Sequence, residues 1–316
     1  MTDTIEVMDQ NGNRVRIPRT EYSNQIMTIA KQQWDNLQFF RQIAPQMLQE
    51  GFVDEALELA NRACEISGGH IPDMYWKAAA LAESGLLDEA GDLFAEVQED
   101  AAYAADQARA AVGLARVRAR QQREKDAEDL LEWAVKTDPD NPQYLVIFYG
   151  YYNERNRADD GLARVRNLAL NHQNKTSGLR ALMQIAANRG EIDEARNLAE
   201  EALKTANDVD KQNLFAEISW HYGQAKMPEA IISFLAPRIE EVKHPLAQMN
   251  LAQAYIDTGK KDNALSLLQA IDRQAPPDLK PMVAAKLREL QPESEQVAES
   301  APESGADAGA NQPPQA

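Results

Sequence analysis

The chain has 316 residues, of which 44% are hydrophobic and 26% charged, and it contains a single cysteine, Cys64. Its formal net charge of −17 disfavours binding to nucleic-acid phosphates or anionic lipids, and one cysteine excludes an internal disulfide. The N-terminus lacks a basic, apolar leader, and no apolar run reaches the roughly 18 residues of a membrane span. We therefore expect a cytoplasmic protein that contacts neither nucleic acid nor membrane.

Residues 1–34 are predicted to form a β-hairpin followed by a helix. Two short runs of alternating apolar residues flank an Asn-Gly pair, and their apolar residues are Ile5, Val7, Val15 and Ile17. Asn and Gly tolerate the backbone of tight hairpin turns, so this pattern predicts two paired strands. Because two strands alone are marginal in water, their apolar face should rest on a helix over roughly 20–33, through Tyr22, Ile26 or Ile29.

From residue 35 to 276 the apolar pattern is helical and repeats. One small residue follows each predicted turn between helices: Ala56, Ala90, Ala127, Gly161, Ala195, Ala230 and Ala264. The intervals are 34, 37, 34, 34, 35 and 34 residues, which is the length of one helix-turn-helix unit. Four of these residues have a glycine five positions earlier, where a helix can end in the left-handed conformation: Gly51, Gly85, Gly190 and Gly259.

The last unit carries the pattern most fully, with Leu251, Ala252, Tyr255, Ala264, Leu268 and Pro276 at characteristic spacings. It resembles the tetratricopeptide repeat family, and seven such units in phase extend the resemblance over roughly 35–276. The resemblance implies an all-α fold: a right-handed α-solenoid of about seven tetratricopeptide-like units. With the predicted hairpin at one end, this array forms most of the chain.

Two units depart from the family pattern. The fourth has Gly161 in place of alanine and the bulky Tyr149 where a small residue is usual, so we expect its helices to pack further apart. In the sixth, Glu217 falls where leucine is expected.

Residues 277–290 are predicted to form a C-terminal capping helix, with apolar residues at helical spacing: Leu279, Val283, Leu287 and Leu290. Such a helix would close the exposed end of the array. Residues 291–316 contain five acidic residues, no Lys or Arg, and no aromatic residue, which predicts a disordered acidic tail.

Paired acids recur at the start of second helices, as in Asp54–Glu55, Asp88–Glu89 and Asp193–Glu194. We interpret them as helix-starting residues, because carboxylates there meet unpaired backbone N–H groups and the positive end of the helix dipole. The four histidines and Cys64 have no metal-ligand or nucleophile spacing. We therefore expect no catalytic residues, no cofactor and no metal, and a protein that is not an enzyme.

Binding is expected on the inner wall that the first helices of such an array form together. The offsets from the turn residues place these side chains there: Tyr75, Trp76, Gly113, Arg116, Arg120, Arg180, Gln184, Asn188, Asn250 and Gln253. Arg109 lies one turn earlier on its helix, and the apolar stretch 144–152 adds Val146, Ile147 and Gly150. Arginines inside so acidic a chain favour a guest with carboxylates, because the guanidinium fork pairs with them bidentately.

The favoured hypothesis is a non-enzymatic adaptor or scaffold that binds a peptide or protein segment, acidic or C-terminal, in its concave groove. The acidic tail could occupy the same groove from within the chain. The alternative is a regulatory or assembly subunit of an enzyme complex, acting through its convex face or its hairpin. An enzyme with an unrecognised site is a third hypothesis, and the sequence leaves the oligomeric state open.

Overall fold

The computed structural model describes residues 3–8, 14–171 and 173–290. The predicted acidic tail, its predicted occupancy of a groove and His172 lie outside these residues. Backbone contacts divide the chain into two compact units, Met1–Leu182 and Met183–Ala316, called unit 1 and unit 2 below. The helix-turn-helix repeats are counted separately, from the first to the seventh repeat unit. Each unit is described by itself.

The predicted hairpin is present at the start of unit 1. Strands β1 (Thr4–Met8) and β2 (Arg14–Pro18) are antiparallel, with Ile5 opposite Ile17 and Val7 opposite Val15. Helix α1 (Arg19–Gln32) follows directly, and its first backbone N–H donates to the carbonyl of Asp3. The hairpin is therefore tied back to the start of the helix that supports it.

The hairpin and α1 rest on the first repeat through part of the predicted apolar face. Ile5, Tyr22 and Ile26 pack against the cluster that contains Phe40 and Met47. Ile29, the third of the predicted alternatives, is 40% exposed and is not among the residues that pack against this cluster.

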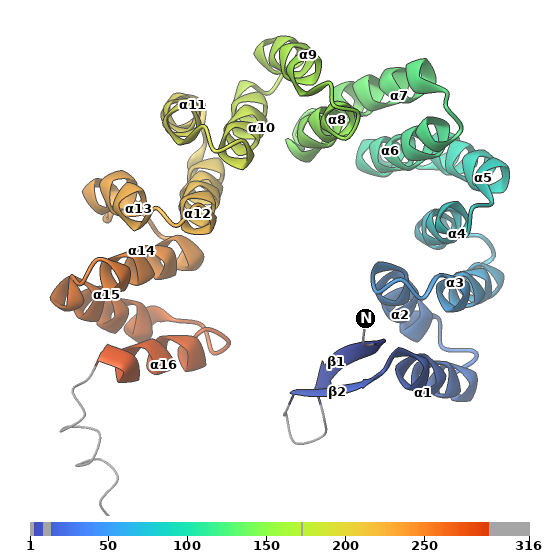
Figure 1. The fold of residues 1–316 in the computed structure, drawn as a ribbon, viewed down its shortest axis with the longest axis horizontal. Coiled ribbons are helices and arrows are strands. Elements are labelled where there is room, and N and C mark those ends of the chain that lie inside the picture. The colour runs from blue at the N-terminus through green and yellow to red at the C-terminus, as the bar shows by residue number, and fades with distance from the viewer. Residues whose placement is uncertain (1–2, 9–13, 172, 291–316) are drawn as a thin grey trace, which may run out of the picture. The chain divides into compact units, whose positions relative to one another are not determined.

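Fourteen helices then follow as seven consecutive pairs (Figure 1). The first helices of the pairs are α2 (Leu37–Gln49), α4 (Ile71–Glu83), α6 (Ala104–Arg120), α8 (Gln143–Asn153), α10 (Lys175–Asn188), α12 (Asp208–Gln224) and α14 (Pro245–Asp257). The second helices are α3 (Val53–Ser67), α5 (Leu87–Asp100), α7 (Glu124–Thr137), α9 (Ala158–Leu170), α11 (Ile192–Thr205), α13 (Pro228–Leu235) and α15 (Lys261–Gln274). This confirms the predicted all-α array of seven helix-turn-helix units.

Every turn within a pair contains one residue with a positive φ angle. These residues are Gly51, Gly85, Gln122, Asn156, Gly190, Lys226 and Gly259. Glycine is favoured there because it has no Cβ to clash in the left-handed region. The four predicted glycines are confirmed, and three units make the same turn with a larger residue.

The left-handed residue corrects the register of the sixth unit. In the other units it lies five residues before the small turn residue, but five residues after Lys226 is Ile231, not Ala230. Ile231 is 4% exposed and Ala230 is only half-buried. The same one-residue shift places Ile218, which is fully buried, where Glu217 was expected to replace leucine.

The fourth unit is not loosened by its departures from the pattern. A Cβ on Gly161 would lie 2.5 Å from the Cβ of Tyr152, so α8 and α9 approach closely at this point. Tyr149 is itself 8% exposed and is accommodated within the unit. The expectation that these helices pack further apart is therefore wrong where Gly161 lies.

In unit 2, a short 3-10 helix η1 (Ala236–Arg238) follows α13. The last element in the described part of unit 2 is helix α16 (Lys280–Leu290). The predicted apolar residues of α16, and Leu279 just before it, all pack in or against the cluster that contains Leu268 and Ile271. Val283 is fully buried there. The predicted closing helix is thus confirmed as a cover for the last pair.

The paired acids lie in the first turn of their helices, at Asp54–Glu55, Asp88–Glu89 and Asp193–Glu194. No side chain at the preceding cap position bonds the helix in these three cases. The acids therefore interact with helix termini whose N–H groups have no side-chain cap, in agreement with the helix-starting interpretation.

Candidate functional site

A hollow of about 550 Å³ lies in unit 1 between the first helices α4, α6 and α8 and the second helix α7. It is lined by Glu83, Ala115, Arg116, Ala119, Arg120, Leu131, Ile147, Gly150, Tyr151, Glu154 and Arg155. Its charged side chains are three arginines and two glutamates, a formal excess of one positive charge. In a chain of net charge −17, this is a local reversal of sign.

The floor of the hollow is apolar where α8 presents Ile147 and Gly150 to it. Leu145 and Phe148 are almost completely buried in the core, and this leaves Ile147 and Gly150 on the face toward the hollow. A Cβ added to Gly150 would meet nothing within 4 Å, so the space above it is open. Buried Ala115 of α6 and Leu131 of α7 complete this floor.

Two predicted arginines, Arg116 and Arg120, line the hollow one helical turn apart on α6. Arg120 donates a hydrogen bond to the carbonyl oxygen of Ala82 near the end of α4, which orients its guanidinium. Arg116 is exposed, and its guanidinium forms no hydrogen bond or ion pair with the residues that the structure describes. Its donors are available to a guest.

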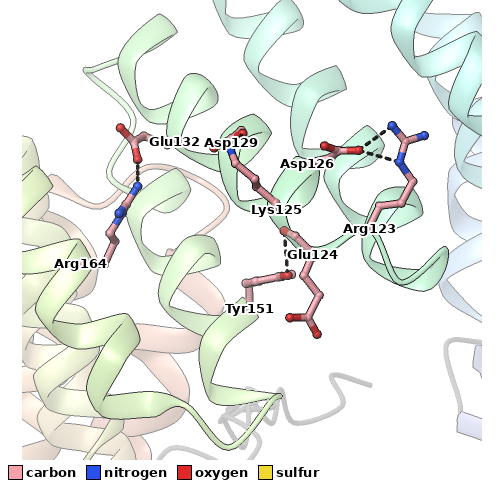
Figure 2. Close-up of polar contacts among 8 residues, drawn as sticks. All are labelled: Arg123, Glu124, Lys125, Asp126, Asp129, Glu132, Tyr151 and Arg164. Carbon is pink, nitrogen blue, oxygen red and sulfur yellow. Dashed lines mark hydrogen bonds and ion pairs between the residues drawn. The ribbon is translucent and has the colours of Figure 1, made fainter.

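A third arginine, Arg155, comes from the turn after α8 and is fixed through Tyr151. Its guanidinium carbon lies 3.8 Å from the centre of the Tyr151 ring, and Nη1 donates to the Tyr151 carbonyl at 2.9 Å. The Tyr151 hydroxyl in turn donates to the carbonyl of Glu124 on α7 at 3.3 Å (Figure 2). Burial raises the pKa of Tyr151, so its hydroxyl stays protonated as the donor.

Figure 2 also shows how α7, which bears Leu131 of the floor, is held to its neighbour. Arg164 of α9 pairs with Glu132 of α7, and Lys136 bonds the other Glu132 oxygen at 2.7 Å. The bond from Lys136, followed by the one from Arg164, lowers the pKa of Glu132. The ionised Glu132 carboxylate therefore links α7, which bears Leu131 of the floor, to α9.

Three other predicted residues of unit 1, Tyr75, Trp76 and Arg109, pack together and do not line the hollow. Tyr75 lies edge-on to Phe94 with ring centres 5.5 Å apart and is also in contact with Trp76. Arg109 lies over the Tyr75 ring at 4.8 Å and pairs with Asp106 at 2.5 Å. These contacts leave Arg109 less available than Arg116.

Gly113 does not face the inner wall, and this prediction is wrong. A Cβ on Gly113 would lie 2.4 Å from the Phe94 ring, so the residue is covered by that ring. Val146 and Arg180 are half-buried residues of unit 1 that do not line the hollow.

Four predicted residues belong to unit 2 and form no part of this hollow. Asn250 donates to the Ser219 hydroxyl at 3.0 Å, and Gln253 bonds Asp257 at 2.7 Å and Lys286. Gln184 is half-buried and Asn188 exposed. Asn250 and Gln253 therefore link elements within unit 2.

Seven residues that line the hollow were not predicted from the sequence: Glu83, Ala115, Ala119, Leu131, Tyr151, Glu154 and Arg155. Glu83, Arg120 and Glu154 each lie two residues before the left-handed residue of their unit. That shared offset could have identified the glutamates, but only Gly85 among the three left-handed residues is a glycine.

Burial raises the pKa of Cys64 to about 11, so the thiolate, its nucleophilic form, is suppressed. No group of three or more His, Cys, Asp or Glu residues there could hold a metal ion. No described helix is long and apolar enough to cross a membrane.

No protein-family model matches the chain, and no curated protein matches it. Solved structures do. Yeast Tom70 shares 13% identity at a TM-score of 0.46, covering 89% of this chain and 60% of its own. Cut9 in the APC/C Cut9–Hcn1 hetero-tetramer shares 15% at 0.37, covering 86% and 52%. A thermophilic tetratricopeptide repeat protein of Thermus thermophilus shares 23% at 0.34, covering 58% and 98%.

The present chain thus spans little more than half the length of the first two structures. Seven helix pairs, each closed by a left-handed residue 33 to 37 positions after the last, decide the fold on their own. The array has the architecture of tetratricopeptide repeats, and the hollow draws on three consecutive repeats of it.

Proposed function

We propose that the chain is a non-enzymatic protein-interaction adaptor whose hollow binds a segment of a partner protein. The observation that carries the proposal is the juxtaposition of Arg116 and Arg120 with an apolar floor. Guanidinium forks bind carboxylates bidentately, and a concave apolar surface buries a guest's aliphatic side chains. The guest is therefore a segment with at least one carboxylate and adjacent apolar residues.

A paired charge reversal tests this proposal. Arg116→Glu together with Arg120→Glu should abolish capture of partner proteins that the unchanged chain retains on an affinity column. Arg123→Glu is the matched control: Arg123 is also exposed, but it pairs with Asp126 outside the hollow (Figure 2). If the doubly substituted chain still captures the same partners, the hollow is not the binding surface.

A second candidate is an assembly subunit that binds through its hairpin. In the described part of the chain, β1 and β2 pair only with each other, and Val15 is 36% exposed. A sheet edge of this kind can accept a further strand from a partner. Val15→Asp should then abolish partner capture, whereas the paired arginine changes would leave it intact.

A further inference from the structure

The hollow contains two glutamates beside its arginines, so both signs of charge face a guest. We infer that the hollow selects a segment with a basic, an acidic and a second basic residue, spaced about three residues apart, over a run of acids. This inference rests on the proposed function, because it specifies the guest of the same hollow.

Three charged residues of alternating sign occupy one repeated position. Glu83, Arg120 and Glu154 lie two residues before the left-handed residue of consecutive units, near the C-terminal ends of α4, α6 and α8. All three line the hollow and are exposed. A guest that crosses these helices meets a negative, a positive and a second negative side chain in turn.

The two glutamates are free to act on a guest. In the ranges that the structure describes, neither the Glu83 nor the Glu154 side chain forms a hydrogen bond or ion pair with another residue. An entirely acidic guest would therefore place like charges opposite them, which disfavours binding. Arg116, one turn from Arg120, strengthens the central positive site so that it can hold one carboxylate between two guanidinium groups.

The spacing follows from helix packing. Packed helices lie roughly 8–10 Å apart, and an extended chain advances about 3.3 Å per residue. Neighbouring charges of the guest are therefore about three residues apart, as in Lys-x-x-Glu-x-x-Lys. The intervening residues lie over Ala115, Ala119 and Ile147, so they are small or aliphatic.

Fluorescence anisotropy with labelled, end-capped heptapeptides tests the pattern. The three probes are Lys-x-x-Glu-x-x-Lys, its reordered form Lys-x-x-Lys-x-x-Glu, and Glu-x-x-Glu-x-x-Glu, with Ala and Leu at each x. The first two have the same composition and charge, so general attraction to an acidic chain affects them equally. We expect the first to bind at least fivefold more tightly than the second and about tenfold more tightly than the third.

Variants of the full chain identify the residues responsible. Glu83→Lys with Glu154→Lys should reverse the order, so that the all-acidic peptide binds most tightly. Equal affinity for the two peptides of identical composition would overturn the inference, as would an unchanged order in this variant. If the all-acidic peptide instead binds best to the unchanged chain and requires Arg116 and Arg120, the inference fails and the proposed function stands. If Arg116→Glu with Arg120→Glu alters no peptide's affinity, both fail.

Discussion

Gln122, Asn156 and Lys226 adopt the left-handed backbone conformation at turns where the other four units have glycine. That conformation costs a residue with a Cβ about 1–2 kcal/mol, whereas glycine loses about 0.5–1 kcal/mol through its freedom in the unfolded chain. We expect Gln122→Gly to raise the free energy of unfolding by about 0.5–1 kcal/mol, measured by urea denaturation.

The matched control for this change is Gly85→Ala. Gly85 has a φ of +84° and open space where a Cβ would lie, so only the backbone conformation opposes the new methyl group. Alanine should lower the free energy of unfolding by about 1 kcal/mol. A destabilised Gln122→Gly variant would contradict the prediction.

These residues also mark how far single positions could be predicted from the sequence. Four turns could be predicted because their left-handed residue is a glycine: Gly51, Gly85, Gly190 and Gly259. The turns at Gln122 and Lys226 could not be predicted in this way. The register predicted for the sixth repeat unit is wrong by one residue for this reason. Lys226 gives no sequence signal for the left-handed turn that precedes Ile231. Arg116 and Arg120 could be predicted because their four-residue spacing places them on one helical face.

At the scale of helices, Gly113 sets the distance between α5 and α6. Its missing Cβ makes room for the Phe94 ring, which would otherwise lie 2.4 Å from it. Gly113→Ala should cost about 1–3 kcal/mol of stability through this overlap, measured by thermal denaturation. Adding Phe94→Leu should recover part of the loss.

Gly150 supplies the control, because it lies inside a first helix with nothing within 4 Å of its potential Cβ. Gly150→Ala should stabilise the chain by roughly 0.5–1 kcal/mol, since alanine favours the helical backbone. Equal effects at the two glycines would show that packing against Phe94 is not the cause.

An ion pair joins the first helices α2 and α4. Two Arg41 nitrogens, Nε and Nη2, each donate to an Asp73 oxygen at 2.8 Å, and the Asp73 side chain is only 1% exposed. Arg41→Ala leaves this carboxylate buried without its partner, so it should cost about 2–3 kcal/mol in urea denaturation. Combining it with Asp73→Ala should recover part of that cost.

The exposed pair Lys125–Asp129 serves as the comparison (Figure 2), with side chains 84% and 61% exposed. Lys125→Ala should cost less than about 0.5 kcal/mol, because water already screens the pair. A similar loss at Arg41 would mean that the buried pair contributes no more than a surface one.

The helix pairs could be predicted because their period and turn residues are local features of the sequence. The composition of the hollow could not be predicted in full. Arg155 and Tyr151 reach it from the end of α8, and Glu83 from the end of α4, so their meeting depends on how consecutive units pack. Gly113 was misassigned for the same reason, since only the packed structure shows the Phe94 ring above it.

At the scale of the whole molecule, the two compact units should respond differently to acid. His221 of unit 2 is 7% exposed, and burial lowers its pKa, with Glu217 opposing the shift. The unfolded chain therefore binds the proton first, and His221 favours unfolding as pH falls below about 6.5. The loss approaches at most about 1.4 kcal/mol per pH unit. Glu132 of unit 1, whose pKa is lowered, loses its contribution only as pH falls below about 4.5.

Tryptophan fluorescence can separate the units, because Trp220 is the single tryptophan of Met183–Ala316. The emission of Trp220 is the difference between the emission of the unchanged chain and that of Trp220→Phe. We expect this difference to show that unit 2 unfolds at a lower urea concentration at pH 5 than at pH 6.5. His221→Phe should remove most of that pH dependence. The same dependence in that variant would assign it to another group.

The hollow takes every one of its side chains from residues 83–155, although the array continues through α15. Solenoid repeats contact chiefly their immediate neighbours. Duplication or loss of units after α9 would therefore leave the hollow's composition untouched, so the array could change its length during evolution while its recognition chemistry is inherited intact.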